Sequence, residues 1–177
     1  MSMRPLFAMA AALMLTPNMA EAQEMPKPAP EMSQIAFFEG SWTCQGKVAA
    51  TPMGPAGDTQ GSVEIKRDLN GFWQSGVVKS TMANMPPMEG RFHVTYDPGA
   101  KRFVMFWVDN MGGWAQSSAS GLQGDTLTYE GDSHMGAMTM KSRDTFTRSG
   151  TGSLKHVSSA NVDGKWMTMF EETCTKK

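Results

Sequence analysis

Methionine is the most unusual chemical feature of this sequence. The chain has 18 methionines, 13 of them after residue 22, and two clusters stand out. Thioether sulfurs are soft ligands that select Cu(I). The clusters therefore predict a copper site, although methionine also fills gaps in apolar cores. The predicted metal ligands are Met82, Met85, Met88, His134, Met135 and Met138.

Two cysteines, Cys44 and Cys174, are the second chemical signal. An even number of cysteines in an exported chain is typical of a disulfide. Two cysteines cannot complete a tetrahedral zinc site, and the sequence has no CxxC redox motif. We therefore expect a Cys44–Cys174 disulfide, with free thiols or metal ligation as the alternatives.

The third chemical signal is a pair of charged side chains at strand positions that alternation places on the same face as apolar side chains. Arg67 is in phase with Ile65, and Asp144 is in phase with Phe146. Inside a barrel both would point inward, where an unpaired charge is costly. We expect an Arg67–Asp144 pair or a water cluster that holds the barrel in register, with a polar anchor for a small ligand as the functional alternative. The expected site is completed by Trp42, Tyr96, Phe106, Trp107, Trp114 and Trp166 as walls, with Asp109 and Gln116 at the mouth.

Motifs for catalysis are missing from the sequence. It contains no Gly-x-Ser-x-Gly elbow, no His-x-x-x-His pair, and no phosphate or dinucleotide loop. The sequence therefore does not predict an enzyme.

These residues lie on a series of short strands. Alternating polar and apolar residues predict ten of them, and 103–108, apolar on both faces, is predicted to lie at the centre of the core. Turn residues separate the strands, among them Asn70-Gly71, Asp97-Pro98-Gly99, 131–133 and Asp163-Gly164. The predicted strands are 41–50, 61–69, 71–81, 90–96, 101–109, 113–121, 125–131, 136–147, 153–162 and 164–174.

One short helix is expected before the strands. Residues 23–31 are proline-rich and predict an extended tether, and 32–39 carry a helical pattern. Ser33 is the expected N-cap, and Gly40 is the expected stop. This helix would plug one end of the domain, 32–177.

The fold predicted from this pattern is an all-β, antiparallel, up-and-down barrel of about ten strands. Sheets of this size curl, and closure removes their exposed edges. In such a barrel the first and last strands are neighbours. They carry Cys44 and Cys174, so the disulfide would lock the seam.

Several short motifs resemble an uncharacterised bacterial secreted family, the domain of unknown function 1579. Its similarity covers most of 33–174 and implies a calycin-like barrel, related to lipocalins and nitrobindins, without a known activity. The motifs are Gly40-x-Trp42, Leu69-Asn70-Gly71-Phe72-Trp73, Tyr96-Asp97-Pro98 with Phe103, Trp107-Val108-Asp109, Gly124-Asp125-x-Leu127 and Arg143-Asp144.

Haem is not expected, because the sequence departs from the nitrobindin pattern. Nitrobindins hold haem through a histidine near the last strand, whereas 164–174 contain none. His156 lies one strand earlier, and all three histidines are expected to be satisfied or solvent-facing.

The start of the chain predicts export. Arg4 precedes an apolar run that is too short to span a bilayer, and Ala20-Glu21-Ala22 has the small-x-small cleavage pattern. We expect a signal peptide over 1–22 and a periplasmic or secreted protein without stable membrane insertion. The remainder has 15 basic and 16 acidic residues, so no basic face predicts nucleic-acid binding.

The function predicted from the sequence is binding or carriage of a small apolar or amphiphilic molecule inside the barrel. A periplasmic Cu(I)-binding protein is one alternative. A structural envelope protein with a filled barrel is the other. No protein partner is predicted.

Overall fold

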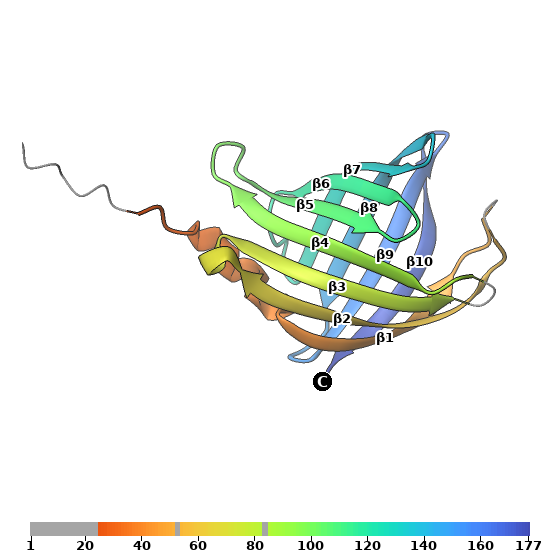
Figure 1. Ribbon diagram of the computed structural model, residues 1–177, viewed down its shortest axis with the longest axis horizontal. Helices are drawn as coiled ribbons and strands as arrows, with labels where there is room; N and C mark the ends of the chain where they lie inside the picture. The colour runs from red at the N-terminus through yellow and green to blue at the C-terminus, as the bar shows by residue number, and fades with distance from the viewer. Residues whose placement is uncertain (1–24, 52–53, 83–84) are drawn as a thin grey trace, which may run out of the picture.

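The protein is a ten-stranded antiparallel barrel preceded by one short helix (Figure 1). The computed structural model describes residues 25–51, 54–82 and 85–177, so the predicted signal peptide lies outside the described residues. The strands are β1 (Gly40–Val48), β2 (Gly57–Asp68), β3 (Trp73–Met82), β4 (Met88–Asp97), β5 (Arg102–Asp109), β6 (Gly113–Ala119), β7 (Thr126–Met135), β8 (Met138–Arg148), β9 (Ser153–Val162) and β10 (Lys165–Lys176).

The sheet closes because β1 pairs with β10 as well as with β2. Every other strand pairs with its neighbours in the chain, so the predicted up-and-down order is confirmed. The seam register places Cys44 directly opposite Cys174, and the two cysteines form a disulfide across 130 residues. The predicted seam disulfide is therefore confirmed.

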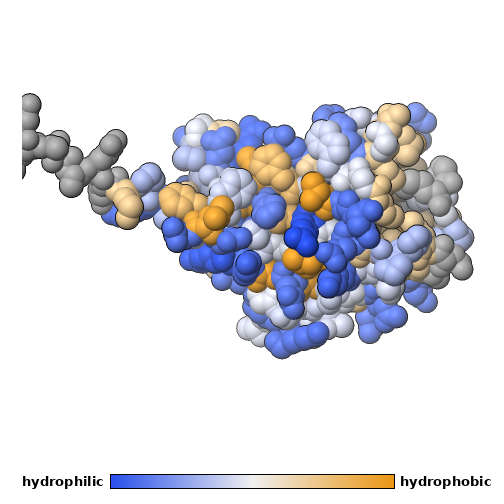
Figure 2. Space-filling view, viewed as in Figure 1, coloured by the Kyte–Doolittle hydropathy of each residue, from blue (hydrophilic) through white to orange (hydrophobic). Residues whose placement is uncertain are grey.

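Closure gives each strand one inward and one outward face. On β5, Phe103 and Met105 are buried, whereas Phe106 and Val108 are 40% and 51% exposed. The prediction that 103–108 is the centre of a core on both faces is wrong, because the outward side chains of this barrel strand face solvent. Figure 2 shows such apolar side chains scattered among polar ones on the outer surface.

A 3-10 helix, η1 (Pro30–Phe38), covers one end of the barrel. Its Ile35 side chain is 1% exposed within the core. Three side-chain hydrogen bonds hold the helix in place, one of them from Lys176 Nζ to the Phe37 carbonyl at 3.3 Å. Trp42 Nε1 donates to the Phe38 carbonyl at 2.8 Å, and Gln74 Nε2 donates to the Ile35 carbonyl at 2.9 Å. The predicted plug is present.

The start of η1 differs from the expectation. The helix begins at Pro30 after Ala29, so its first residues belong to the segment predicted as a tether. Ser33 is not the N-cap; its hydroxyl donates to the Pro30 carbonyl at 2.8 Å. A proline fixes the backbone dihedral that the first helical turn needs, which favours the earlier start.

Two predicted turns also differ. Asn70 and Gly71 lie in a short 3-10 turn, η2 (Leu69–Gly71), where both have positive φ. The predicted turn at 131–133 is instead the middle of β7. A Cβ atom at Gly131 would overlap the backbone of Gln116 on β6, so this glycine permits a close approach of two strands.

Helices contribute little to the described chain. Over residues 25–51, 54–82 and 85–177, no helix is long and apolar enough to span a membrane.

Removing the disulfide should destabilise the barrel without changing its topology. In the chain-entropy model a loop of 130 residues contributes roughly 4 to 5 kcal/mol, which is an upper value for a C44A/C174A variant. The β1–β10 ladder remains, so the far-ultraviolet circular dichroism spectrum should not change. Urea unfolding of the variant and of the oxidised and reduced native protein measures the effect. Equal unfolding midpoints in all three would contradict a stabilising seam.

Candidate functional site

A cavity of about 400 Å³ occupies the barrel interior. It extends from Phe38 and Trp42 near η1 to Met82, Asp109 and Met135 at the strand ends on the opposite side. We call this opposite end the mouth. The cavity exists because inward-facing glycine, alanine and serine leave room that larger side chains would fill.

Aromatic rings lie flat against part of the cavity wall. The Trp107 ring covers Gly90 on the neighbouring strand, and the Phe92 ring covers Gly76; a Cβ atom at either glycine would overlap the ring. Both aromatic residues line the cavity. Because each glycine lacks a side chain, the ring above it can lie along the wall and does not project across the interior.

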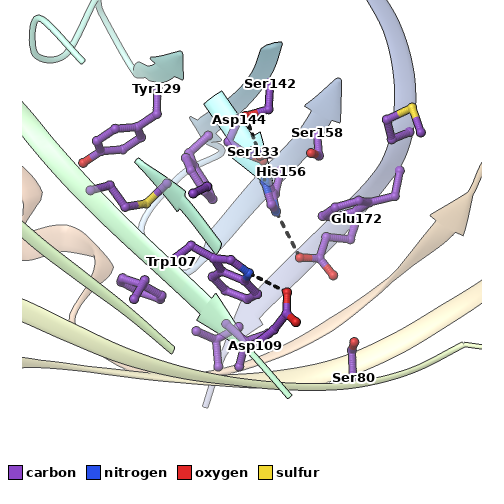
Figure 3. Close-up of a pocket in the computed structure, with 18 of the residues that line it drawn as sticks. Ser80, Trp107, Asp109, Tyr129, Ser133, Ser142, Asp144, His156, Ser158 and Glu172 are labelled. Atoms are coloured by element: carbon purple, nitrogen blue, oxygen red, sulfur yellow. Dashed lines mark hydrogen bonds and ion pairs between the residues drawn. The ribbon is translucent and has the colours of Figure 1, made fainter. Parts of the chain in front are cut away.

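A polar cluster from three adjacent strands faces this apolar interior. Nε2 of His156 on β9 lies 3.1 Å from Oδ1 of Asp144 on β8, and Nδ1 lies 3.2 Å from Oε1 of Glu172 on β10. The side chains are 13%, 23% and 14% exposed, respectively. Figure 3 shows the three side chains together within the pocket. We call this set the Asp144–His156–Glu172 cluster.

The geometry of the cluster specifies a protonated imidazole. A neutral imidazole has one N–H, whereas both ring nitrogens of His156 face a carboxylate oxygen. Burial alone lowers the pKa of His156, but the hydrogen bonds and charges of Asp144 and Glu172 outweigh burial and raise this pKa from 6.5 to about 9. His156 also stacks on Phe146, with ring centroids 4.2 Å apart. The cluster thus places one imidazolium between two acidic side chains.

This arrangement leaves little capacity for haem binding or for catalysis by His156. Both nitrogens donate hydrogen bonds, so neither has a lone pair for a metal or a substrate proton. Cys44 and Cys174 lie close to Glu172 but are joined in the disulfide and supply no thiolate. His156 is therefore not available as a metal ligand.

Other polar groups on the wall have unused hydrogen-bonding capacity. Tyr129 is 3% exposed and lines the cavity, and its hydroxyl has no hydrogen-bond partner among the described residues. Burial raises its pKa, so the phenol is neutral. Ser158 also lines the cavity, whereas Ser133 donates to Ser142 at 2.8 Å. Figure 3 shows these groups on the wall around the cluster.

Asp109 forms a second polar point, near the mouth. Its carboxylate accepts hydrogen bonds from Trp107 Nε1 at 3.0 Å and from the backbone N–H groups of Met111 and Gly113 at 2.9 Å each. These bonds close the β5–β6 turn and hold the Trp107 indole in position. Asp109 is therefore both a turn residue and a wall residue.

Five of the ten residues predicted for a ligand site line the cavity. Trp114 is 50% exposed and stacks on His134 with centroids 3.7 Å apart, while Trp42 is 1% exposed near η1. Whether any of the five contacts a ligand remains a prediction. The five residues are Trp42, Trp107, Asp109, Trp114 and Asp144.

The other five do not line the cavity. Arg67 is 53% exposed and pairs with Glu39 at 3.1 Å, so the predicted Arg67–Asp144 pair is wrong. Arg67 has the same alternation phase as the inward-facing residues of β2. It nevertheless lies at the end of that strand, beyond the plug. Tyr96 packs edge-on against Phe103 within the core, 5.2 Å between centroids.

Phe106, Gln116 and Trp166 lie on the outer face. Phe106 and Gln116 alternate with lining residues and so point outward. Trp166 contacts the Arg143 guanidinium, which lies 4.0 Å above its ring. A register shift between Thr168 and Phe170 changes the phase of β10, which simple alternation could not reveal.

The methionine clusters divide between the wall and the surface. Met82, Met88 and Met135 line the cavity near the mouth, as does His134, and Met140 and Met169 join them. Met85 does not line it, and Met138 is 49% exposed. Copper binding by these residues remains a prediction.

The principal residues missed by the sequence analysis are Glu172, Tyr129 and, as a cavity residue, His156. The signal was present: Glu172 is in phase with Cys174, and His156 is in phase with Leu154. Extending the phase argument from Asp144 to the last two strands would have identified His156 and Glu172 as inward-facing residues, although not as its partners.

The cluster makes stability depend on pH in the alkaline range. His156 has a raised folded-state pKa, so its contribution is complete below pH 6.5 and is lost as the pH rises through about 9. The shift corresponds to about 3 kcal/mol. Nuclear magnetic resonance titration should show one of the three histidines titrating near pH 9. The signal should vanish in His156→Gln, and the alkaline loss should be absent from D144N/H156Q/E172Q. A His156 midpoint at 6.5 or below would contradict the charged cluster.

Comparison with solved structures places the fold among calycin-like barrels. The protein of the "Crystal Structure of Rv2717c from M. tuberculosis" is 10% identical, with a TM-score of 0.65, and the match covers 85% of this chain and 99% of that chain. The S-type phycobiliprotein lyase CPES from Guillardia theta is also 10% identical, with a TM-score of 0.52 and coverage of 85% and 98%. At these identities the likeness shows the fold alone.

The comparison with curated proteins finds no match. The family model described as "Protein of unknown function (DUF1579)" matches residues 27–176, which include η1 and the whole barrel. The chain therefore belongs to the DUF1579 family.

Proposed function

We propose that the protein binds and carries a small apolar or amphiphilic molecule in its barrel, after export and cleavage near Ala22. The observation that carries the proposal is the interior cavity of about 400 Å³. Its size is within the range of small-molecule sites, and its wall combines apolar side chains with a few convergent polar groups. A barrel whose interior is filled by side chains, as the structural alternative requires, would not have this space.

The position of the cavity also supports this function. η1 covers one end, where Trp42, Phe103 and Leu127 are at most 1% exposed. The lining continues to the mouth, so a ligand would enter there and bury its apolar part toward the plug. Removal of apolar surface from water supplies the driving force, about 25 cal/mol per Å².

Cu(I) binding is the second candidate function, and it has an observation of its own. Five methionines line the mouth half of one cavity, and an exported protein encounters copper. The five are Met82, Met88, Met135, Met140 and Met169.

Native mass spectrometry of protein purified from its own cell envelope tests both functions. A carrier should retain an organic mass increment, and a copper protein should retain the mass of copper. If the disulfide is intact, the polypeptide itself should be two hydrogens lighter than the reduced chain. Protein that consistently lacks any increment and takes up neither probe described below would contradict both functions.

Filling the cavity should abolish apolar-ligand binding. Val78 lines the cavity, so Val78→Trp should weaken binding of the uncharged fluorophore N-phenyl-1-naphthylamine by at least about tenfold. Val77→Trp is the matched control, because Val77 lies outside the cavity lining on the same strand. Fluorescence titration measures both affinities. Equal affinities in the two folded variants would place the fluorophore outside the barrel.

The copper candidate predicts a different sensitivity. Changing Met82, Met88 and Met135 together to leucine removes three of the five thioethers that line the mouth while keeping the side chains apolar. Cu(I) uptake should be lost, and circular dichroism should show the same fold. Competition with a Cu(I) chelator measures the uptake. Unchanged Cu(I) affinity would exclude this methionine cluster as the copper site.

A further inference from the structure

The cavity wall carries acidic groups without a matching basic side chain. Asp109, Asp144 and Glu172 all line it, and none of the described residues in the wall is lysine or arginine. The outer surface differs, because several acidic residues there pair with basic ones, for example Glu171 with Lys155 at 3.1 Å. The excess of acidic groups is thus a property of the interior.

His156 does not neutralise this excess. Its two N–H groups engage one oxygen each of Asp144 and Glu172, so one imidazolium charge faces two carboxylate charges. One imidazolium between two carboxylates gives the cluster a net charge of −1. A net charge in a low-dielectric interior is unfavourable unless another group compensates it.

The second oxygen of each carboxylate is available for such a group. Oδ2 of Asp144 and Oε2 of Glu172 accept no hydrogen bond from any described residue. Tyr129, nine-tenths buried, offers an unpartnered hydroxyl on the same wall. Several acceptors and no basic side chain are what a cationic hydrogen-bond donor requires.

The rest of the wall suits an apolar body attached to that cation. Phe146 and Phe170 contact His156, and Phe92 and Trp107 cover the glycines of the wall. An anionic ligand would be repelled by the cluster, and a neutral one would leave its charge uncompensated. An ammonium group would compensate the charge and also tolerate the aromatic faces.

We infer that the ligand of the barrel is a cationic amphiphile, with an ammonium group at the Asp144–His156–Glu172 cluster and an apolar body along the aromatic wall. This inference rests on the proposed carrier function and specifies its ligand class. The cluster is the specificity determinant, whereas the cavity supplies the apolar binding.

The test compares ligands that differ only in their polar end. Two series are used at pH 7: 4-phenylbutylamine, 4-phenylbutanol and 4-phenylbutyrate, and the corresponding decyl compounds. Isothermal titration calorimetry should give an affinity for the amine at least tenfold above that for the alcohol, with the carboxylate weakest. Stronger or equal binding of the alcohol or the carboxylate would overturn the cationic inference and leave the carrier function intact.

Two variants locate the ammonium group. Glu172→Gln and Asp144→Asn each remove one charge with little change of shape, and each should lower amine affinity at least tenfold more than it lowers alcohol affinity. Glu171→Gln is the matched control, because Glu171 pairs with Lys155 on the outer face of the same strand and should have no effect. Retained alcohol binding shows that a variant is folded.

The remaining outcomes distinguish failure of the assigned ammonium site from failure of the carrier function. Unchanged amine affinity in both cluster variants would overturn the assigned ammonium site. Failure of all six compounds to bind the native protein would overturn the carrier function itself.

Discussion

Pairing of the first strand with the last is the constraint on which the rest of this structure depends. The β1–β10 ladder removes both edges of the sheet, and the Cys44–Cys174 disulfide links the same two strands at directly opposed positions. Closure leaves each strand a single inward face. Small residues on that face leave an interior space, and larger ones form its wall. The cavity follows from closure together with the choice of inward residues.

The same constraint explains why charged groups occur inside. Asp144, His156 and Glu172 belong to three consecutive strands, and the register places His156 between the two acids across the sheet. An isolated buried carboxylate is costly, and a charged hydrogen bond reduces that cost. The imidazolium can serve two acids only because its nitrogens face opposite neighbours. The arrangement orders three side chains and leaves acceptor oxygens free.

The two ends of the barrel have different chemistry. At the plug end, η1 is held by hydrogen bonds from Trp42 and Gln74, and the Lys176 ammonium lies 5.3 Å from the Trp42 ring. The mouth instead contains methionines and Asp109. Flexible thioether side chains can adapt to molecules of different shape. This difference between the two ends gives the cavity one rigid end and one adaptable end.

The sequence by itself determined the strand order, the plug, the closed barrel and the disulfide, because each is encoded in local periodicity or in chain order. Alternation also placed Asp144 on the inward face. The tertiary structure decided which polar groups meet. Arg67 lies beyond the plug with Glu39, and a register shift on β10 directs Trp166 outward. The partners of Asp144 depend on the register of β8, β9 and β10, and register is set by the packing of the whole barrel rather than by any one strand.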